Sequence, residues 1–358
     1  MSHRIPMAAE AFAVRAAPRR IVTRLLRRAR RSAETASALA GHVGLAVTML
    51  GLLRPAAAIL SYPRVLALAR SVGLVRAAMP LRGRARRSQI RRTFGADIDA
   101  SEATRFAAEY LARPLCDGVV LRRFMLRGWT DFANWRVDQR STAAVDALRA
   151  SDESFIVATG HFSRQAFMPL YNPGIVPQKI TSILLPRTRR TIDPYTWWLS
   201  YHYGQMLDCL HAARPDMEFV HPRQTGGWQR LVETLGRPRN AVVVHADARA
   251  GQASGRYVRA FAGIEGRQFA TGAARLSRVT GRPIAVCIPY LVDDETIVLD
   301  WTRVIRPRPG DDETSDIEVT NLILDDIEKA IGRRPWQYLL DYLGERSWDP
   351  WTEQWVAS

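Results

Sequence analysis

Short apolar runs rich in β-branched residues recur along the second half of the chain and predict buried strands. The runs cover residues 155–159, 180–185, 241–245 and 284–289. Between them lie segments in which apolar residues recur at helical spacing, at 228–235 and 271–280. Strands that alternate with helices typically form a mostly parallel sheet covered by helices. We therefore predict an α/β fold in which these four strands share one largely parallel sheet.

Weaker patterns predict further elements around this sheet. A short strand is expected at 217–220, and a hairpin is expected around Asp293 and Asp294 with its return strand at 296–301. Helical spacing predicts a helix headed by Ser101, followed by helices at 141–150 and 317–331. Residues 88–150 are thus expected to be helical and to lead into the first strand.

The first apolar run ends in Thr159-Gly160-His161-Phe162, and helix-compatible residues follow as far as Pro169. This pattern places His161 at the carboxyl end of a buried strand, where open α/β sheets bind their ligands. A histidine in that place acts as a general base when a partner orients its imidazole ring. The alternative is a histidine that caps the following helix or bonds to a loop.

Asp247 is the second candidate, because it follows the apolar run at 241–245 in the same way. If the two strands are neighbours, both side chains lie at one rim of the sheet. A carboxylate beside the imidazole would then favour the charged form of the histidine. The competing interpretation is that Asp247 caps a helix or pairs with Arg249.

The first 80 residues differ in composition from the rest of the chain. Residues 1–37 are dense in arginine, and between Arg19 and Arg31 apolar residues recur at helical spacing. This predicts either a basic amphipathic helix lying on an anionic membrane or a disordered basic tail. The most apolar run, 39–53, would be about 22 Å long as a helix, less than the roughly 30 Å hydrocarbon core. Because arginines flank it on both sides, we predict a monotopic or re-entrant anchor, with a spanning helix as the alternative.

These patterns divide the chain into five segments. They are a basic N-terminal segment (1–37), a hydrophobic membrane anchor (38–80), a helical lead-in (81–150), an α/β domain (151–345) and a tryptophan-rich tail (346–358). Trp348, Trp351 and Trp355 in the tail are expected to pack a C-terminal flap, or alternatively to lie at a membrane interface.

Charge narrows the choice of partners. The formal net charge is +16 and comes almost wholly from arginine, which suits acidic lipid headgroups, an acidic carrier protein or nucleic acid. Zinc-finger spacing and RNA-binding aromatic signatures are absent from the sequence, so nucleic acid is not expected. Cys116, Cys209 and Cys287 are far apart and odd in number, which predicts a reducing compartment without a disulfide framework or metal site.

The residues Thr159-Gly160-His161-Phe162, followed by a helix, resemble the first motif of the lysophospholipid-acyltransferase superfamily. The branch that they resemble most is the lipid A biosynthesis (lauroyl/myristoyl) acyltransferases. In that family an acid five positions after the histidine completes a His-x4-Asp/Glu dyad, and here Ala166 occupies its place. The similarity covers roughly residues 80–345. It continues in Asp247-Ala248-Arg249-Ala250-Gly251, Phe261-Ala262-Gly263, Gly281-Arg282-Pro283 and Pro335-Trp336-Gln337-Tyr338.

The resemblance implies a glycerol-phosphate-acyltransferase-like fold and an enzyme on the cytoplasmic face of a bacterial inner membrane. Such an enzyme moves a fatty acyl chain from acyl carrier protein or acyl-CoA, used as co-substrate without a cofactor or metal, to a lipid or glycolipid acceptor. The acceptor would be lipid A-like or another envelope lipid, and the partners would be membrane lipids and an acidic acyl carrier protein.

Two sets of residues are assigned on this basis. Because Ala166 replaces the family's acid, we predict that Asp247 stands in for it beside His161. Five arginines are candidates for binding the anionic parts of the substrates, although a solvated charge run is the alternative for residues 187–190. They are Arg164, Arg187, Arg189, Arg190 and Arg249.

The opposing hypothesis is a non-catalytic relative that keeps the fold to bind lipid or a partner enzyme. The retained residues 159–162 favour the enzyme, and the missing acid favours the non-catalytic protein.

Overall fold

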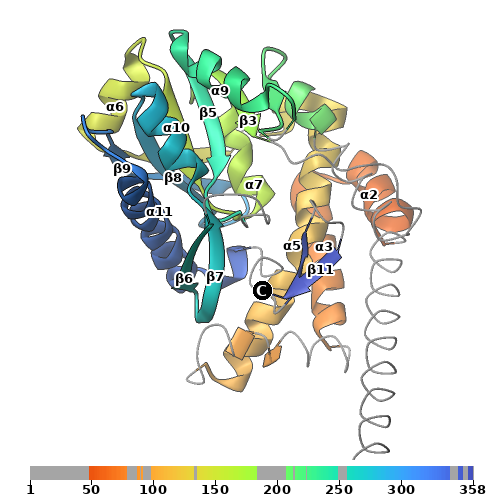
Figure 1. Cartoon of the computed structure of the whole chain (residues 1–358). Coiled ribbons are helices and arrows are strands. Elements are labelled where there is room, and N and C mark those ends of the chain that lie inside the picture. The colour runs from red at the N-terminus through yellow and green to blue at the C-terminus, as the bar shows by residue number, and fades with distance from the viewer. Residues whose placement is uncertain are drawn as a thin grey trace, which may run out of the picture.

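The computed structural model describes residues 48–78, 87–88, 90–91, 98–132, 135–183, 207–212, 214–222, 224–248, 256–338, 346–349 and 354–357. Its centre is a seven-stranded sheet in the order β1-β9-β8-β2-β5-β3-β4 (Figure 1). These strands are β1 (Arg136–Arg140), β2 (Phe155–Thr159), β3 (Lys179–Ile183), β4 (Glu218–Val220), β5 (Asn240–His245), β8 (Ile284–Leu291) and β9 (Thr296–Ile305).

All neighbouring strands of the sheet run parallel except β8 and β9, which form an antiparallel hairpin. The four apolar runs correspond to β2, β3, β5 and β8, so the predicted, largely parallel sheet is confirmed. The second run ends earlier than predicted, at Ile183, and residues 184–185 lie outside the described residues. The predicted return strand after Asp293 and Asp294 is β9.

Helices cover both faces of the sheet. They are α2 (Arg54–Ile59), α3 (Tyr62–Ala78), α5 (Ala100–Arg127), α6 (Ala143–Ala150), α7 (Arg164–Phe167), α9 (Gly227–Gly236), α10 (Gly272–Thr280) and α11 (Glu313–Arg333). A π-helical segment, η1 (Thr48–Leu53), precedes α2. Short 3-10 segments are η2 (Gly128–Phe132), η3 (Met168–Tyr171) and η4 (Pro335–Gln337).

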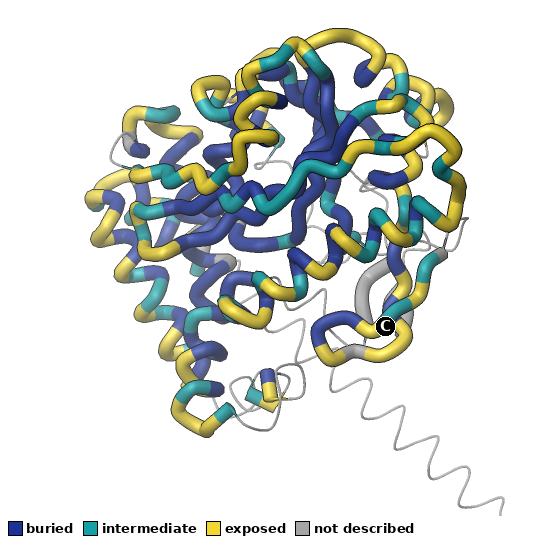
Figure 2. The backbone as a smooth tube through the Cα atoms, turned by 90° about the vertical axis from the view of Figure 1, so that its left-hand side faces the viewer, coloured by how far each residue is buried: buried dark blue, intermediate teal, exposed yellow. Residues whose placement is uncertain are grey.

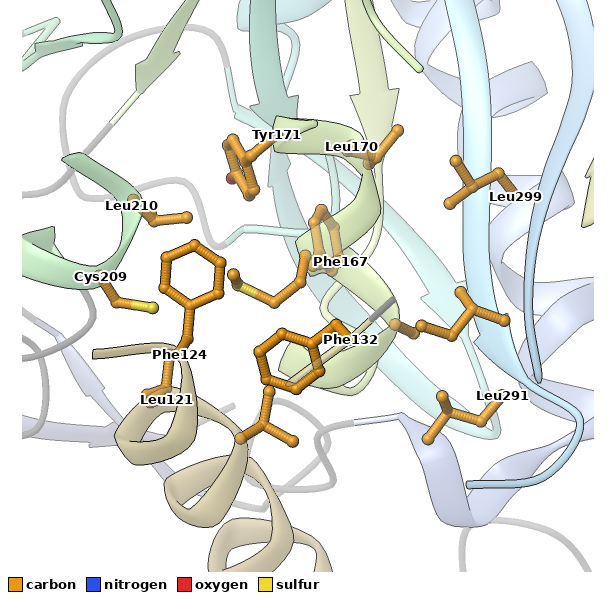
Figure 3. Close-up of a cluster of buried hydrophobic side chains, with 14 of the residues drawn as sticks. Leu121, Phe124, Phe132, Phe167, Leu170, Tyr171, Cys209, Leu210, Leu291 and Leu299 are labelled. Atoms are coloured by element: carbon orange, nitrogen blue, oxygen red, sulfur yellow. The ribbon is translucent and has the colours of Figure 1, made fainter. Parts of the chain in front are cut away.

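Alternation along each strand divides the buried side chains into two cores. On β2, Phe155 and Val157 face one core, whereas Ile156 and Ala158 face the other. The first core is closed by α3, α5, α6 and α7, and Figure 3 shows its aromatic centre around Phe124, Phe132 and Phe167. The second core is closed by α9, α10 and α11. The strands between them are therefore buried on both faces, as the dark tube in Figure 2 shows.

The second half of the predicted anchor packs against the fold. Val65, Leu66 and Ala69 on α3 are fully buried, because α3 lies alongside α5 (Figure 1). Arg123 of α5 donates hydrogen bonds to the carbonyl oxygens of Ala57 and Leu60 at the end of α2. Residues 1–47, with the arginine-dense segment and most of the 39–53 run, lie outside the described residues. None of the described helices has the length and apolar composition needed to cross a bilayer.

Three local predictions differ from the structure. The helix predicted to begin at Ser101 is capped by Asp99, whose carboxylate accepts a hydrogen bond from the backbone N–H of Glu102. The segment expected to be helical throughout contains β1, an edge strand whose polar sequence gives no alternating pattern. The helix after the histidine motif is only four residues long, because Pro169 follows it and a 3-10 turn takes over.

Two hairpins lie apart from the main sheet. β6 (Arg256–Phe261) pairs with β7 (Ile264–Ala270) around the turn at Ala262 and Gly263, and both turn residues have positive φ. In the tail, β10 (Arg346–Asp349) pairs with β11 (Gln354–Ala357), which places Trp348 opposite Trp355. Trp351 lies outside the described residues.

Candidate active site

His161 lies two residues beyond β2, at the carboxyl edge of the parallel strands. Gly160 allows the chain to pass close to α11 there. A Cβ on Gly160 would lie 2.9 Å from Cγ2 of Ile327 and 3.1 Å from the ring of Phe162. The side chain of His161 is 17% exposed, so solvent and small molecules reach only part of the imidazole ring.

Asp247 comes to the same place because β5 is the neighbour of β2. Thr159 pairs with His245 in the register of the two strands, and the N–H of Ala246 donates to the carbonyl oxygen of Thr159 at 2.8 Å. Two residues further on, the carboxylate of Asp247 is fully buried. The prediction that His161 and Asp247 share one rim required β2 and β5 to be neighbours, and the structure shows that they are.

The carboxylate of Asp247 binds both the ring and the backbone of His161. Nδ1 of His161 lies 2.6 Å from Oδ1, and the backbone N–H of His161 donates to Oδ2 at 2.7 Å. The hydroxyl of Tyr338 donates to the same Oδ2 at 2.5 Å. Three groups from two residues that are far apart in the chain, His161 and Tyr338, thus fix one buried carboxylate, which in turn fixes the orientation of the imidazole.

The charge state follows from these contacts. Burial would raise the pKa of Asp247, but the nearby charge of His161 and the hydrogen bonds from His161 and Tyr338 hold it below its usual range. An ionised carboxylate accepts hydrogen bonds, so Nδ1 of His161 carries a proton. In the neutral ring the basic lone pair then belongs to Nε2. This is the tautomer that a general base requires.

His245, the last residue of β5, forms one wall beside the imidazole of His161. The two imidazole centroids are 4.3 Å apart, and the ring of Phe167 stacks on His245 at 4.9 Å with 23° between the planes. Burial, and then the charge of His161, lowers the pKa of His245 to about 3. His245 is therefore neutral at physiological pH and presents a ring without charge to its neighbour.

Arg267 on β7 lies beneath the turn that carries Asp247. Its guanidinium is 1% exposed, lies between the rings of Phe261 and Phe269, and donates to the carbonyl oxygen of Asp247 at 3.4 Å. Nε and Nη1 of this side chain have no hydrogen-bond partner among the described residues. The contact to the carbonyl oxygen ties the β6–β7 hairpin to the turn at the site.

The sequence predicted the contact of His161 with Asp247 but missed Tyr338, His245 and Arg267 as its neighbours. Tyr338 belongs to the segment Pro335-Trp336-Gln337-Tyr338, which was noticed as a motif without a role. His245 is the last residue of an apolar strand, and no pattern along the chain distinguishes it from an ordinary strand end. Arg267 follows Gly266 within β7, in a hairpin that the sequence did not predict.

The structure does not describe the side chains of the predicted substrate-binding arginines. Arg164 is the first residue of α7, three positions after His161, and its side chain is not described. The remaining four, Arg187, Arg189, Arg190 and Arg249, lie outside the described residues. Their assignment stays a prediction.

The cysteines do not compete with this site as nucleophiles. All three cysteines are free and buried, and burial raises the pKa of Cys116 and Cys209 to about 12. Their thiols are therefore protonated at neutral pH and poor nucleophiles. Within the described part of the chain, no group of three or more His, Cys, Asp and Glu residues is arranged to hold a metal ion.

The comparisons with known proteins give only a loose structural similarity to this chain. No protein-family model matches the sequence, and no curated protein matches it. Among solved structures, the chain is similar to the crystal structure of the 1-acyl-sn-glycerophosphate (LPA) acyltransferase PlsC from Thermotoga maritima. The similarity has 14% sequence identity and a TM-score of 0.33, and it covers 62% of this chain and 83% of that one. That neighbour is an acyltransferase, and at this level of similarity the chemistry of the present chain has to come from its own residues.

Replacing Tyr338 with phenylalanine tests how the site carboxylate is held. The ring would still pack against Phe162 and Phe261, but Oδ2 of Asp247 would lose one donor. A hydrogen bond to a charged group contributes roughly 1.5 kcal/mol or more, so we expect a loss of about 1.5 kcal/mol in the free energy of unfolding. Chemical denaturation of the two proteins at pH 7 measures this difference, and equal stabilities would contradict the assigned bond.

Proposed function

We propose that this protein is a membrane-associated acyltransferase in which His161 is the general base and Asp247 its orienting carboxylate. The observation that supports the proposal is the 2.6 Å contact between Nδ1 of His161 and Oδ1 of Asp247 at the carboxyl edge of a parallel sheet. Asp247 reaches His161 from the neighbouring strand, so the acid that Ala166 replaces in the His-x4-Asp/Glu pattern is supplied from elsewhere in the chain.

The reaction that suits this pair is transfer of an acyl group from a thioester to a hydroxyl. Nε2 of His161 takes the proton of the acceptor hydroxyl as its oxygen attacks the thioester carbonyl carbon. The tetrahedral intermediate collapses, the carbon–sulfur bond breaks, and the leaving thiolate takes the proton back from the imidazolium. Asp247 stays ionised throughout and stabilises the imidazolium while it exists.

The substrates are proposed from charge and from the resemblance. The donor is acyl carrier protein or acyl-CoA, and the acceptor is a lipid or glycolipid such as a lipid A-like or other envelope lipid. The net charge of +16 suits an acidic carrier protein and anionic lipid headgroups. The arginines Arg164, Arg187, Arg189, Arg190 and Arg249 are proposed to bind anionic parts of these substrates. The proposed place of action is the cytoplasmic face of a bacterial inner membrane.

Exposed apolar side chains support membrane association. Ile59 at the end of α2 is 81% exposed, and Leu52, Met125 and Leu126 are also large apolar residues on the surface. Such residues near basic groups suit an interface that binds acidic lipids.

A non-catalytic lipid-binding or partner-binding protein is the second candidate. The observation that favours it is Ala166, which is fully buried in the core and puts a methyl group where the family's motif has an acid. The two candidates differ in a single measurable property, namely whether acyl groups move.

Transfer is tested with the full-length protein in membranes. Radiolabelled acyl-CoA or acyl carrier protein is added to the protein with a bacterial lipid extract, and labelled lipid products are separated by chromatography. We expect labelled lipid with the wild-type protein and none above background with His161→Ala. Equal amounts of labelled lipid with and without the protein would contradict the enzyme and favour the non-catalytic candidate.

Membrane association is tested by fractionation. We expect the full-length protein to sediment with membranes, and a variant that lacks residues 1–47 to be released in large part. The deletion stops before η1, because Val65, Leu66 and Ala69 beyond it are part of the folded core. Full-length protein that stays in the supernatant without detergent would contradict the proposal.

A further inference from the structure

A cavity of about 300 Å³ lies on the α11 side of the sheet, close to the candidate active site. Phe162, the residue after His161, forms part of its wall together with Ile288 and Tyr290 from β8. The last turns of α11 form the opposite wall and contribute Lys329 and Arg333. The cavity therefore combines an apolar wall with a basic one.

The basic wall carries more positive charge than the described carboxylates of the cavity neutralise. Lys329 and Arg333 are one helical turn apart and exposed on the same side of α11, and Arg334 follows directly. None of the ion pairs formed by the described residues involves these three side chains. Three cations that share one cavity repel each other, and the single carboxylate of Asp300 offsets only part of that repulsion, so a bound anion would reduce it further.

Arg334 is held in place before any ligand arrives. Its guanidinium lies 3.9 Å from the centre of the Tyr290 ring, and its backbone N–H donates to the carbonyl oxygens of Ala330 and Ile331. Tyr290 is itself fixed, because Arg140 donates a hydrogen bond to its hydroxyl at 3.1 Å. A guanidinium that is already oriented loses less conformational entropy when it binds an anion.

The two carboxylates that line the cavity oppose an anion only weakly. Asp326 is saturated, because it accepts two hydrogen bonds from Arg303, at 2.7 and 2.6 Å, and one from Thr302 at 2.6 Å. Asp300 is partly buried, and this burial raises its pKa against the opposing charges of Arg140, Arg333 and Arg334. Arg303 neutralises Asp326, so the three remaining cations outnumber the single carboxylate of Asp300.

We propose that this cavity is a binding site for a phosphate-bearing small molecule. Its phosphate lies among Lys329, Arg333 and Arg334, and the adjoining part of the ligand lies on Phe162 and Ile288. Guanidinium groups bind phosphate through paired, charge-assisted hydrogen bonds, which makes them the preferred partners of this group. The phosphate could belong to a soluble nucleotide-linked molecule or to a phospholipid headgroup. The proposal goes beyond acyl transfer, because it concerns binding and stands whether or not His161 is catalytic.

The test measures binding to full-length protein in detergent micelles by isothermal titration calorimetry, with inorganic phosphate and with coenzyme A as probes. Co-sedimentation with phosphatidate vesicles, compared with phosphatidylcholine vesicles, covers the lipid source. Arg334→Gln should weaken binding of the probe that the wild type binds by about 10-fold, the order expected for loss of one charge-assisted contact. Arg308→Gln, which removes the same charge from an exposed position outside the cavity, should leave the affinity unchanged.

A second variant, which is expected to bind the probe more tightly, distinguishes the proposal from a loss of binding caused by misfolding. Asp300→Asn removes the carboxylate that faces the proposed phosphate, so we expect tighter binding of the same probe. Binding of coenzyme A assigns a soluble source, and binding restricted to phosphatidate vesicles assigns a headgroup. The proposal is overturned if the wild type binds none of the three probes, if Arg334→Gln and Arg308→Gln bind equally well, or if Asp300→Asn binds more weakly.

Discussion

Replacing His161 with alanine, or Asp247 with asparagine, is expected to lower the rate of acyl transfer by about 10²- to 10⁴-fold. The alanine variant removes the base itself. In the asparagine variant the base is present, but the neutral amide no longer stabilises the imidazolium and no longer requires the proton to stay on Nδ1. Transfer of labelled acyl groups to lipid in the membrane assay described above measures both rates.

Matched variants separate this effect from general damage. His211→Ala and Asp208→Asn make the same substitutions at exposed positions far along the chain from β2 and β5, and they should keep wild-type rates. Membrane sedimentation should be equal in all four variants, because neither site residue lies in the N-terminal segments. A wild-type transfer rate in Asp247→Asn would mean that His161 acts without this carboxylate. A wild-type transfer rate in His161→Ala would mean that His161 is not the base.

The central strands could be predicted because their consecutive residues are nearly all apolar. β2 and β5 are buried on both faces, so nearly every residue is apolar and the run stands out from its surroundings. The contact between His161 and Asp247 followed from one further rule, that parallel neighbours end at the same edge. Both residues lie two positions after such runs, which is why the sequence was enough to pair them.

Tyr338 in the site and β1 in the sheet could not be predicted, because their positions depend on contacts between distant segments. Tyr338 is 91 residues from Asp247 in the chain, and the turn after η4 brings its hydroxyl to the carboxylate. β1 is an edge strand of polar residues, whose place is set by pairing with β9 and by no apolar pattern of its own. Periodicity reports which side of an element is buried, but it does not report which partner covers that side.

The position of Ala166 explains why the carboxylate beside His161 comes from another strand. Ala166 faces the first core beside Phe167, and the helix that carries it is a single turn. A carboxylate there would have to point away from this core to reach His161. Asp247 avoids the conflict because it rises from the neighbouring strand and receives its donors at the edge of the sheet. The chain therefore combines an apolar residue at position 166 with an ionised partner for His161.

His245 should make the stability of the protein depend on pH. Its pKa is lowered to about 3 by burial and by the charge of His161, whereas an unfolded histidine titrates near 6.5. The unfolded state therefore binds a proton between these values that the folded state does not bind. The contribution of a neutral His245 is complete above about pH 6.5 and is lost progressively as the pH falls toward 3.

Comparison with His245→Phe isolates this contribution, because phenylalanine keeps an aromatic ring between His161 and Phe167 but cannot bind a proton. Between pH 7 and pH 5 the wild type should lose about 2 kcal/mol more unfolding free energy than the variant, from about 1.4 kcal/mol per pH unit below the unfolded pKa. Urea denaturation at both pH values gives the four free energies required, and the groups that titrate in both proteins cancel in the difference. Parallel losses in wild type and variant would mean that His245 takes up a proton as readily in the folded protein as in the unfolded chain. The ring beside His161 would then be charged at pH 5, and the uncharged wall assigned to this side of the site would not exist under those conditions.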